Sequence, residues 1–199
     1  MGFSGQFVFG RSDRALVEAP VFDEVRLLWG DGAHELWPRP GGWQTLQFRD
    51  DRWGAEQLRA LVDWSGAPAC FAVIHDSDVA HVVGLAPGGQ EWAAVLGLAI
   101  AAEMSLGRPE DVRDDLEWFG SPEYAQAADA ARTAYEAAVP AAAEAAIAWA
   151  AAAGAATTGQ DAVEAVRRSR EVFVEDGFIA LLDALGFPAA VTPAGETEA

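Results

Sequence analysis

The chain has 199 residues and a formal net charge of −18, from 31 acidic and 13 basic residues. This charge disfavours nucleic acid and anionic membrane surfaces as partners and favours a partner with a basic surface. Every basic residue is an arginine, which excludes the catalytic lysines of P-loop NTPases, of the usual protein kinases and of pyridoxal-phosphate enzymes.

The N-terminal residues lack a basic segment followed by an apolar one, so we expect no secretion signal and a cytoplasmic protein. Short runs of β-branched and aromatic residues follow, separated by Gly, Pro and Asp, which is typical of strands. The expected strands cover residues 5–9, 24–29, 33–37 and 43–48. Asp31 and Gly32, between the second and third of these strands, predict a two-residue hairpin turn.

Residues 43–85 predict a β-α-β-β unit. Its elements are a strand at 43–48, a helix at 55–65, and strands at 69–75 and 79–85 joined by a turn at 76–78. Gly66 and Pro68 end the helix, and the apolar character of the next strand predicts a central place in the sheet. That strand holds the only cysteine, Cys70, so disulfides and cysteine-based zinc sites are excluded and we expect a buried, inert thiol.

The sequence becomes helix-forming after residues 87–89. The expected helices cover residues 90–105, 109–119, 123–153 and 161–185. Pro140 breaks or kinks the third helix, because proline removes a backbone donor, and residues 176–177 are a candidate interruption of the fourth. The alanine-rich run at 137–156 contains Pro140 and Glu144, so it is a poor membrane span and we expect no membrane partner.

These elements together predict an α+β fold. We expect an N-terminal mixed or antiparallel sheet of about five or six strands, packed against a C-terminal layer of Ala-rich helices. The sequence predicts a single domain over residues 1–188, sheet-rich in residues 1–88 and helix-rich in residues 89–188. Residues 189–199 are expected to form a flexible polar tail.

Two groups of residues are candidates for binding a basic partner. The first is a run of carboxylates on the short helix: Glu110, Asp111, Asp114, Asp115 and Glu117. Like charges four residues apart oppose helix formation slightly, so docking of a basic partner is one explanation and a solvated acidic face is the other. The second group is Trp37, Trp43 and Trp53, which lie at loop edges near arginines, where exposed indoles are typical of interaction surfaces.

A different kind of site is suggested by His75, Asp76, Asp78 and His81, the densest polar cluster of the sequence. Two imidazoles and two carboxylates around a tight turn are suitable metal ligands. They match no familiar metal spacing, and the alternative is an ordinary turn with satisfied side chains. Residues 84–89 are glycine-rich and are expected between a strand and a helix, yet they fit no phosphate-binding motif, which favours a plain loop.

No signature of a serine or cysteine hydrolase is present, and we expect no cofactor. The leading hypothesis is a non-enzymatic acidic module that binds a basic protein, as inhibitor or immunity proteins bind cationic toxins. The alternative is a small metal-dependent enzyme or ligand-binding domain that uses the His75, Asp76, Asp78 and His81 cluster. A third hypothesis is a homo-oligomeric structural subunit, in which the Ala-rich helices of two copies pack together.

Overall fold

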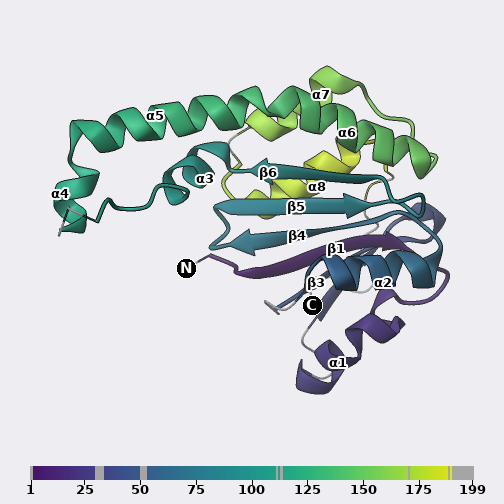
Figure 1. Cartoon of the computed structure of the whole chain (residues 1–199). Coiled ribbons are helices and arrows are strands. Elements are labelled where there is room, and N and C mark those ends of the chain that lie inside the picture. The colour runs from purple at the N-terminus through teal and green to yellow at the C-terminus, as the bar shows by residue number, and fades with distance from the viewer. Residues whose placement is uncertain are drawn as a thin grey trace, which may run out of the picture.

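The computed structural model describes residues 2–29, 34–49, 53–110, 112, 114–169, 171–187 and 189. Within these residues the chain forms an antiparallel sheet with the strand order β2-β3-β1-β4-β5-β6 (Figure 1). The strands are β1 (Gly5–Arg11), β2 (His34–Pro38), β3 (Trp43–Phe48), β4 (Ala69–His75), β5 (Val79–Leu85) and β6 (Glu91–Leu96). The predicted α+β fold is therefore confirmed.

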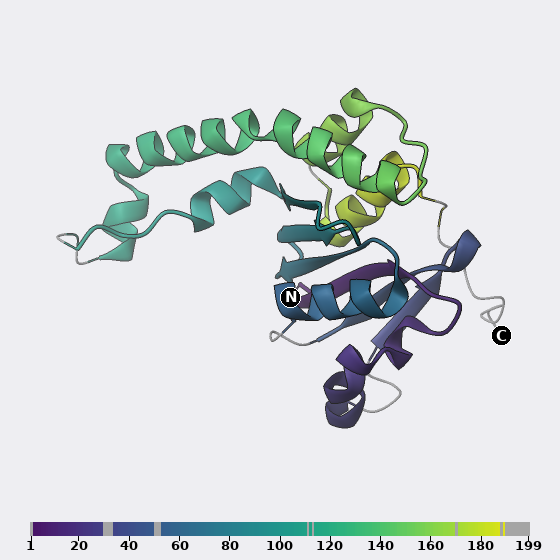
Figure 2. The same ribbon diagram turned by 45° about the vertical axis from the view of Figure 1, so that its right-hand side comes forward.

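Helices cover both faces of this sheet (Figure 2). They are α1 (Asp23–Trp29), α2 (Ala55–Ser65), α3 (Leu98–Met104), α4 (Asp115–Phe119), α5 (Pro122–Ala137), α6 (Val139–Ala152), α7 (Gln160–Arg168) and α8 (Val174–Ala184). Phe7 and Phe9 of β1 pack on one face with α6, α7 and α8, and Val8 packs on the other face with α2 and α1. The predicted Ala-rich layer is thus one of two helical layers, because successive side chains of a strand point to opposite faces.

The predicted strand at residues 24–29 is wrong, because these residues belong to α1. Their apolar residues alternate as in a strand, but the helix buries Val25 and leaves the side chain of Leu27 84% exposed. Short apolar runs fit both kinds of element, so their spacing alone does not separate them. The hairpin turn predicted at Asp31 and Gly32 lies outside the described residues.

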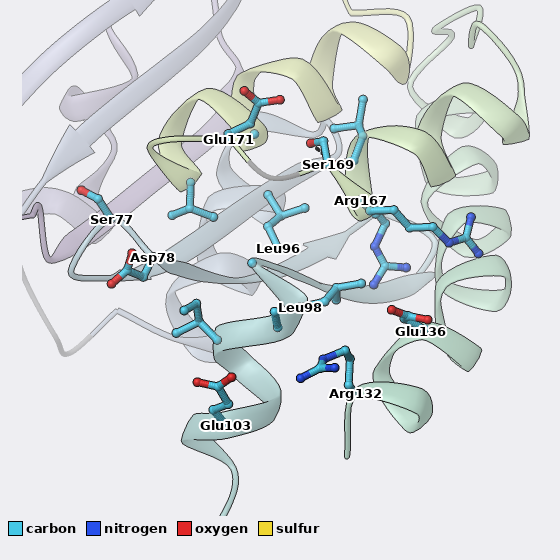
Figure 3. A pocket seen from close by; sticks show the side chains of 17 residues that line it. Ser77, Asp78, Leu96, Leu98, Glu103, Arg132, Glu136, Arg167, Ser169 and Glu171 are labelled. Carbon is cyan, nitrogen blue, oxygen red and sulfur yellow. Dashed lines mark hydrogen bonds between the residues drawn. The ribbon is translucent and has the colours of Figure 1, made fainter. Parts of the chain in front are cut away.

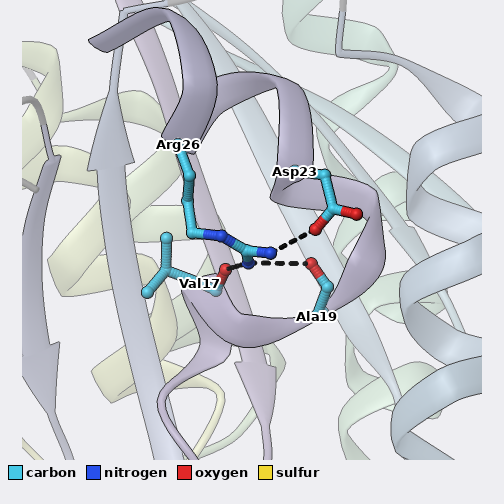
Figure 4. A network of polar contacts seen from close by, with 4 residues as sticks. All are labelled: Val17, Ala19, Asp23 and Arg26. Atoms are coloured by element: carbon cyan, nitrogen blue, oxygen red, sulfur yellow. Dashed lines mark hydrogen bonds and ion pairs between the residues drawn. The ribbon is translucent and has the colours of Figure 1, made fainter. Parts of the chain in front are cut away.

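Arg26 holds α1 against the turn that precedes it. Its guanidinium pairs with Asp23 in the first turn of the helix and donates hydrogen bonds to the backbone carbonyls of Val17 and Ala19 (Figure 4). These carbonyls precede the helix, so one side chain fixes the angle at which α1 leaves the sheet. Sequence spacing could not reveal this contact, because the two carbonyls belong to the backbone.

The predicted helix at residues 90–105 is also wrong in its first half. Residues 91–96 form the edge strand β6, and buried side chains alternate along it from Trp92 to Leu96. Gly97 then turns the chain into α3 with a φ of +75°, a conformation that favours glycine. Residues 84–89 consequently end β5 and enter a β-hairpin, so their predicted position before a helix is incorrect.

The helices of the second half follow the sequence more closely. The predicted helix at 109–119 is limited to α4, which begins at Asp115. The predicted break near Pro140 is confirmed, since α5 and α6 meet at Ala138 and the proline lies in the first turn of α6. Among the helices that the structure describes, none has the length and apolar character needed to cross a membrane.

The last predicted helix, at 161–185, is two helices. The chain leaves the helical conformation after α7 and resumes it at Val174, so the break lies at residues 169–173 and not at 176–177. Gly177 is buried within α8 against the sheet, and this packing outweighs its weak helix propensity. Of the predicted tail, only residue 189 lies within the described part of the chain.

Cys70 lies in β4 and is fully buried, as the sequence predicted. Burial raises the pKa of its thiol, and the nearby charge of Arg39 opposes this effect only in part. The thiolate is the reactive form of cysteine. We therefore expect Cys70 to stay neutral and unreactive while the protein is folded.

The helices α3, α4 and α5 form an arm that extends away from the sheet. α3 leaves the end of β6, α4 lies at the far end, and α5 returns to the body of the protein (Figures 1 and 2). α5 packs against both α3 and α4, which joins the outgoing and returning segments. The fold therefore places α4, part of the predicted acidic cluster, far from the hydrophobic core.

Candidate interaction surface

The far end of the arm, residues 114–119, is called the arm tip. Asp114 caps α4 by accepting a hydrogen bond from the backbone amide of Leu116 at 2.9 Å. Trp118 turns inward, is 7% exposed and packs edge-on against Tyr124 of α5, with ring centroids 5.5 Å apart. This contact fixes the orientation of α4, so its opposite side faces solvent.

Two large apolar side chains of α4 are exposed, although the ring of Phe119 also packs edge-on against Tyr124, with centroids 5.3 Å apart. Leu116 is 81% exposed and Phe119 is 56% exposed. Because they are three residues apart on a helix, they are neighbours on one surface. The arm tip thus presents adjacent apolar side chains on an element that is itself well anchored.

Carboxylates flank this apolar pair along the sequence. Four of the five predicted acidic residues are described, and they are Glu110, Asp114, Asp115 and Glu117. Asp115 pairs with Arg108 at 3.0 Å, across two exposed side chains. Asp111 lies outside the described residues. Exposed apolar side chains with acidic neighbours in the sequence are suited to a partner with a basic surface.

The predicted tryptophans lie elsewhere. Trp43 and Trp53 are only 6% and 5% exposed, so the expected exposure of these indoles is wrong. Trp43 stacks on Phe9 at a centroid distance of 4.9 Å, and Trp53 stacks on Phe22 at 5.2 Å. The positions of these two tryptophans beside loops were correctly predicted, but the sequence does not determine which way their side chains point.

Trp37 belongs to the edge strand β2 and is partly buried. Its ring lies 5.7 Å from that of Phe7, on the face of the sheet that α8 covers. Trp37 and the arm tip come from opposite edges of the structure, β2 and the arm that follows β6. The two predicted groups of partner-binding residues therefore do not form one surface.

The turn at residues 76–78 is a structural junction. Asp76 and Ser77 both have positive φ values, 50° and 61°. Ser77 Oγ accepts a hydrogen bond from the backbone amide of Phe3 at 2.7 Å and donates one to Glu175 Oε1 at 2.6 Å. The backbone amide of Val174 donates to the Ser77 carbonyl at 2.8 Å. The turn thus joins the N-terminal segment, the β4–β5 hairpin and α8.

The four predicted metal ligands take part in this turn or lie beside it. Asp76 accepts a hydrogen bond from the amide of Gly2 at 3.0 Å, and the rings of His75 and His81 meet edge-on with centroids 5.9 Å apart. Among the described residues, including His75, Asp76, Asp78 and His81, no three His, Cys, Asp or Glu side chains are placed to hold a metal ion. The geometry favours the turn interpretation of this cluster.

The pKa of His81 is expected to fall below its ordinary value of 6.5 in the folded protein. Partial burial disfavours the charged imidazolium, and the neighbouring charge of His75 adds to this effect. The unfolded chain therefore binds this proton more readily, so the contribution of His81 to stability is complete above pH 6.5 and decreases as the pH falls below it. An NMR titration should give a midpoint below 6.5 for His81, and a midpoint at or above 6.5 would contradict the prediction.

A cavity of about 450 Å³ lies at the base of the arm. It opens between the turn at residues 77–78, the end of β6, α3, the second half of α5, the end of α7 and the first turn of α8 (Figure 3). Its charged side chains include Arg132 and Arg167 on the helices α5 and α7, and Asp78 and Glu103 on other elements. No local sequence pattern predicts this site, because its residues come from five separate segments.

The fold and these two sites define an acidic α+β protein with a projecting helical arm and a charged cavity at its base. No protein-family model, no curated protein and no solved structure matches the chain. A functional assignment consequently rests on the chemistry of its own residues. The arm tip has the clearest chemical character, because large apolar side chains are exposed there beside carboxylates.

Proposed function

We propose that the chain is a non-enzymatic, acidic protein-binding module that engages a basic protein partner through its arm tip. The observation that carries this proposal is the exposure of Leu116 and Phe119, at 81% and 56%, among carboxylates at the end of a projecting arm. In this arrangement the module is comparable with inhibitor or immunity proteins that block a cationic target. The comparison concerns charge and exposed surface, not ancestry.

The apolar pair supplies the contact energy of this interface. Isolated exposed apolar residues are common on protein surfaces, but Leu116 and Phe119 are adjacent on one short helix. Trp118 and Phe119 anchor this helix against Tyr124 of α5. A preorganised element loses little conformational freedom on binding. The pair is therefore suited to insert into a shallow apolar depression of the partner.

The charge selects the partner and brings it to the tip. Glu117 is an exposed acid of α4 and Glu110 is an exposed acid that precedes this helix in the sequence, on a chain whose net charge is −18. Long-range attraction of this kind raises the association rate of a cationic partner and weakens as salt is added. A basic partner also supplies a counter-charge for each carboxylate that becomes buried at the interface.

The enzyme alternative has less support. Asp76 is engaged by the backbone of Gly2, and Ser77 beside it is bonded to Phe3 and Glu175. The side chains of Asp76 and Ser77 therefore have a structural use that needs no substrate. Metal analysis of protein purified without chelators or an affinity tag is still a direct test, since stoichiometric metal lost in His75→Ala would revive the alternative.

A comparative capture experiment in native extract tests the proposal. The full chain is used as bait beside the double variant Leu116→Ser, Phe119→Ser and the control Leu27→Ser, which changes a leucine of similar exposure, 84%, on α1. The wild type and the control are expected to retain one basic protein that the double variant loses. With the purified partner, the double variant should bind at least about thirtyfold more weakly, because truncation of a central contact typically costs 2 kcal/mol or more.

Two results would contradict the proposal. One is equal capture of the same proteins by the wild type and the double variant. The other is self-association, seen as a dimer by light scattering, that disappears in the double variant, because the tip would then serve a second copy of the chain. Glu110→Gln combined with Glu117→Gln should reduce the salt dependence of partner binding, whereas Glu56→Gln on α2 should leave it unchanged.

A further inference from the structure

Arg167 lines the cavity at the base of the arm, and it is a buried cation that forms no ion pair with a described carboxylate. Arg167 is 3% exposed. Its Nη1 donates a hydrogen bond to the carbonyl of Val139 at 2.9 Å, and its Nη2 lies 3.5 Å from the carbonyl of Val95. Its Nε is buried and has no hydrogen-bond partner among the described residues. The guanidinium of Arg167 thus contacts two neutral carbonyls, and no described carboxylate contacts this guanidinium.

This arrangement is unusual for the chain. The other arginine classed as buried among the described residues is Arg39, and it pairs with Asp183 at 2.9 Å. The sequence holds 31 acidic residues, so carboxylates for a counter-ion are abundant. Burial lowers the pKa of Arg167 and the nearby charge of Arg168 lowers it further, while the charge of Glu164 opposes these effects only in part. A buried charge is normally paired or hydrogen-bonded throughout, and this one lies on a cavity wall.

Two further arginines lie on the rim of the same cavity. Arg132 pairs with Asp129 at 3.1 Å and Arg168 pairs with Glu164 at 2.7 Å, and neither of these acids lines the cavity. The Nε of Arg132 is buried and lacks a partner among the described residues. Both rim arginines therefore keep donors for a ligand while their ion pairs hold them in place. Guanidinium groups of this kind are suited to a carboxylate.

The remaining walls have the opposite charge. Asp78 and Glu103 lie across the cavity from Arg167, and Glu171 lies above them (Figure 3). Glu136 is on the same side as Arg132 and follows it by one turn of α5. These carboxylates would repel a simple anion. A ligand that satisfies both sides needs one negative and one positive group.

We propose that this cavity binds a small zwitterion, an α-amino acid with an apolar side chain. Its carboxylate lies toward Arg167 and Arg132, and its ammonium lies toward Asp78 and Glu103. Apolar side chains between the two charged sides, among them Leu96, Leu98, Val166 and Val174, surround the ligand's side chain. The volume of about 450 Å³ is within the range of small-molecule sites.

The test compares L-leucine with two molecules that each lack one of its charges. These are 4-methylpentanoate, which lacks the ammonium group, and isoamylamine, which lacks the carboxylate. Thermal unfolding screens binding and titration calorimetry measures it, with the full chain in each case. L-leucine is expected to raise Tm, since a ligand of the folded state stabilises it, and each single-charge analogue should bind about tenfold or more weakly.

Variants at exposed positions on the rim of the cavity separate a loss of ligand binding from a loss of folding. Arg132→Gln and Glu103→Gln change partly or fully exposed side chains and should fold, yet each should weaken L-leucine binding by about tenfold or more. Arg167→Met should abolish it, and Glu56→Gln on α2 should leave it unchanged. Absence of L-leucine binding at millimolar concentration would overturn the proposal. So would equal binding of 4-methylpentanoate, or unchanged binding in both rim variants.

Discussion

Replacement of Trp149 by alanine is expected to lower the free energy of unfolding by about 3–5 kcal/mol. Trp149 is fully buried in α6, and its ring lies 5.5 Å from that of Trp92 and 5.4 Å from that of Phe187. Its Nε1 donates a hydrogen bond to the carbonyl of Leu85 at 3.1 Å, which joins the helix to β5. Its buried neighbours on α6 are mainly alanines, which cannot fill the space that the indole would leave.

Urea denaturation of the wild type and of Trp149→Ala measures this loss of stability. Trp149→Phe is the matched variant, because it keeps most of the apolar volume and removes the hydrogen bond to Leu85. Its expected loss is about 1–3 kcal/mol, the cost of a buried acceptor without its donor. A loss below about 1 kcal/mol for Trp149→Ala would contradict the packing of α6 on the sheet, since a cavity of this size is not so easily filled.

The second large effect is expected for Gly97→Ala, at about 2–5 kcal/mol of lost stability. Gly97 joins β6 to α3 with a φ of +75°, and a β-carbon there would lie 2.0 Å from the carbonyl oxygen of Asp78. Such a contact is with backbone, so the β4–β5 turn must move to relieve it. Both segments border the cavity at the base of the arm, and the substitution should therefore also weaken any ligand bound there.

Gly154→Ala separates the two causes of this loss. Gly154 has a φ of +79°, and a β-carbon there meets nothing within 4 Å. This variant should therefore lose only the conformational preference of glycine, about 1–2 kcal/mol. Thermal and urea unfolding of the two variants should differ, with Gly97→Ala the less stable. Equal losses would mean that the close approach of Gly97 to Asp78 does not exist.

Sequence patterns predicted the central part of the fold because local and tertiary preferences agree there. In residues 43–85 the strands are bounded by turn residues, and the helix between them ends at Gly66 in a left-handed conformation. Residues 24–29 and 91–96 were assigned to the wrong element for a different reason. Their apolar spacing fits a short helix and a short strand equally well, and the contacts that decide, such as that of Val25 with the core, are tertiary.

The sites were predicted less well than the fold. The acidic cluster was visible in the sequence, but the exposure of Leu116 and Phe119 follows from the position of α4 on the arm, which no local pattern indicates. The cavity had one local signal, Arg167, which follows Val163 by one turn on the buried face of α7. A charged residue at an apolar position of an amphipathic helix indicates either a buried ion pair or a ligand. Its neighbours in the cavity come from distant segments that no local pattern connects.

Hydrogen–deuterium exchange of the chain with its captured basic partner tests the central proposal most directly. Binding through the arm tip predicts slower amide exchange at residues 114–119 and in the first turn of α5, with exchange in α1 and α2 unchanged. The backbone amides of short exposed helices exchange rapidly in the free protein. Binding of a partner can therefore slow exchange at the arm tip by a large factor. Protection confined to other surfaces, with exchange at the arm tip as fast as in the free protein, would contradict the proposed interface.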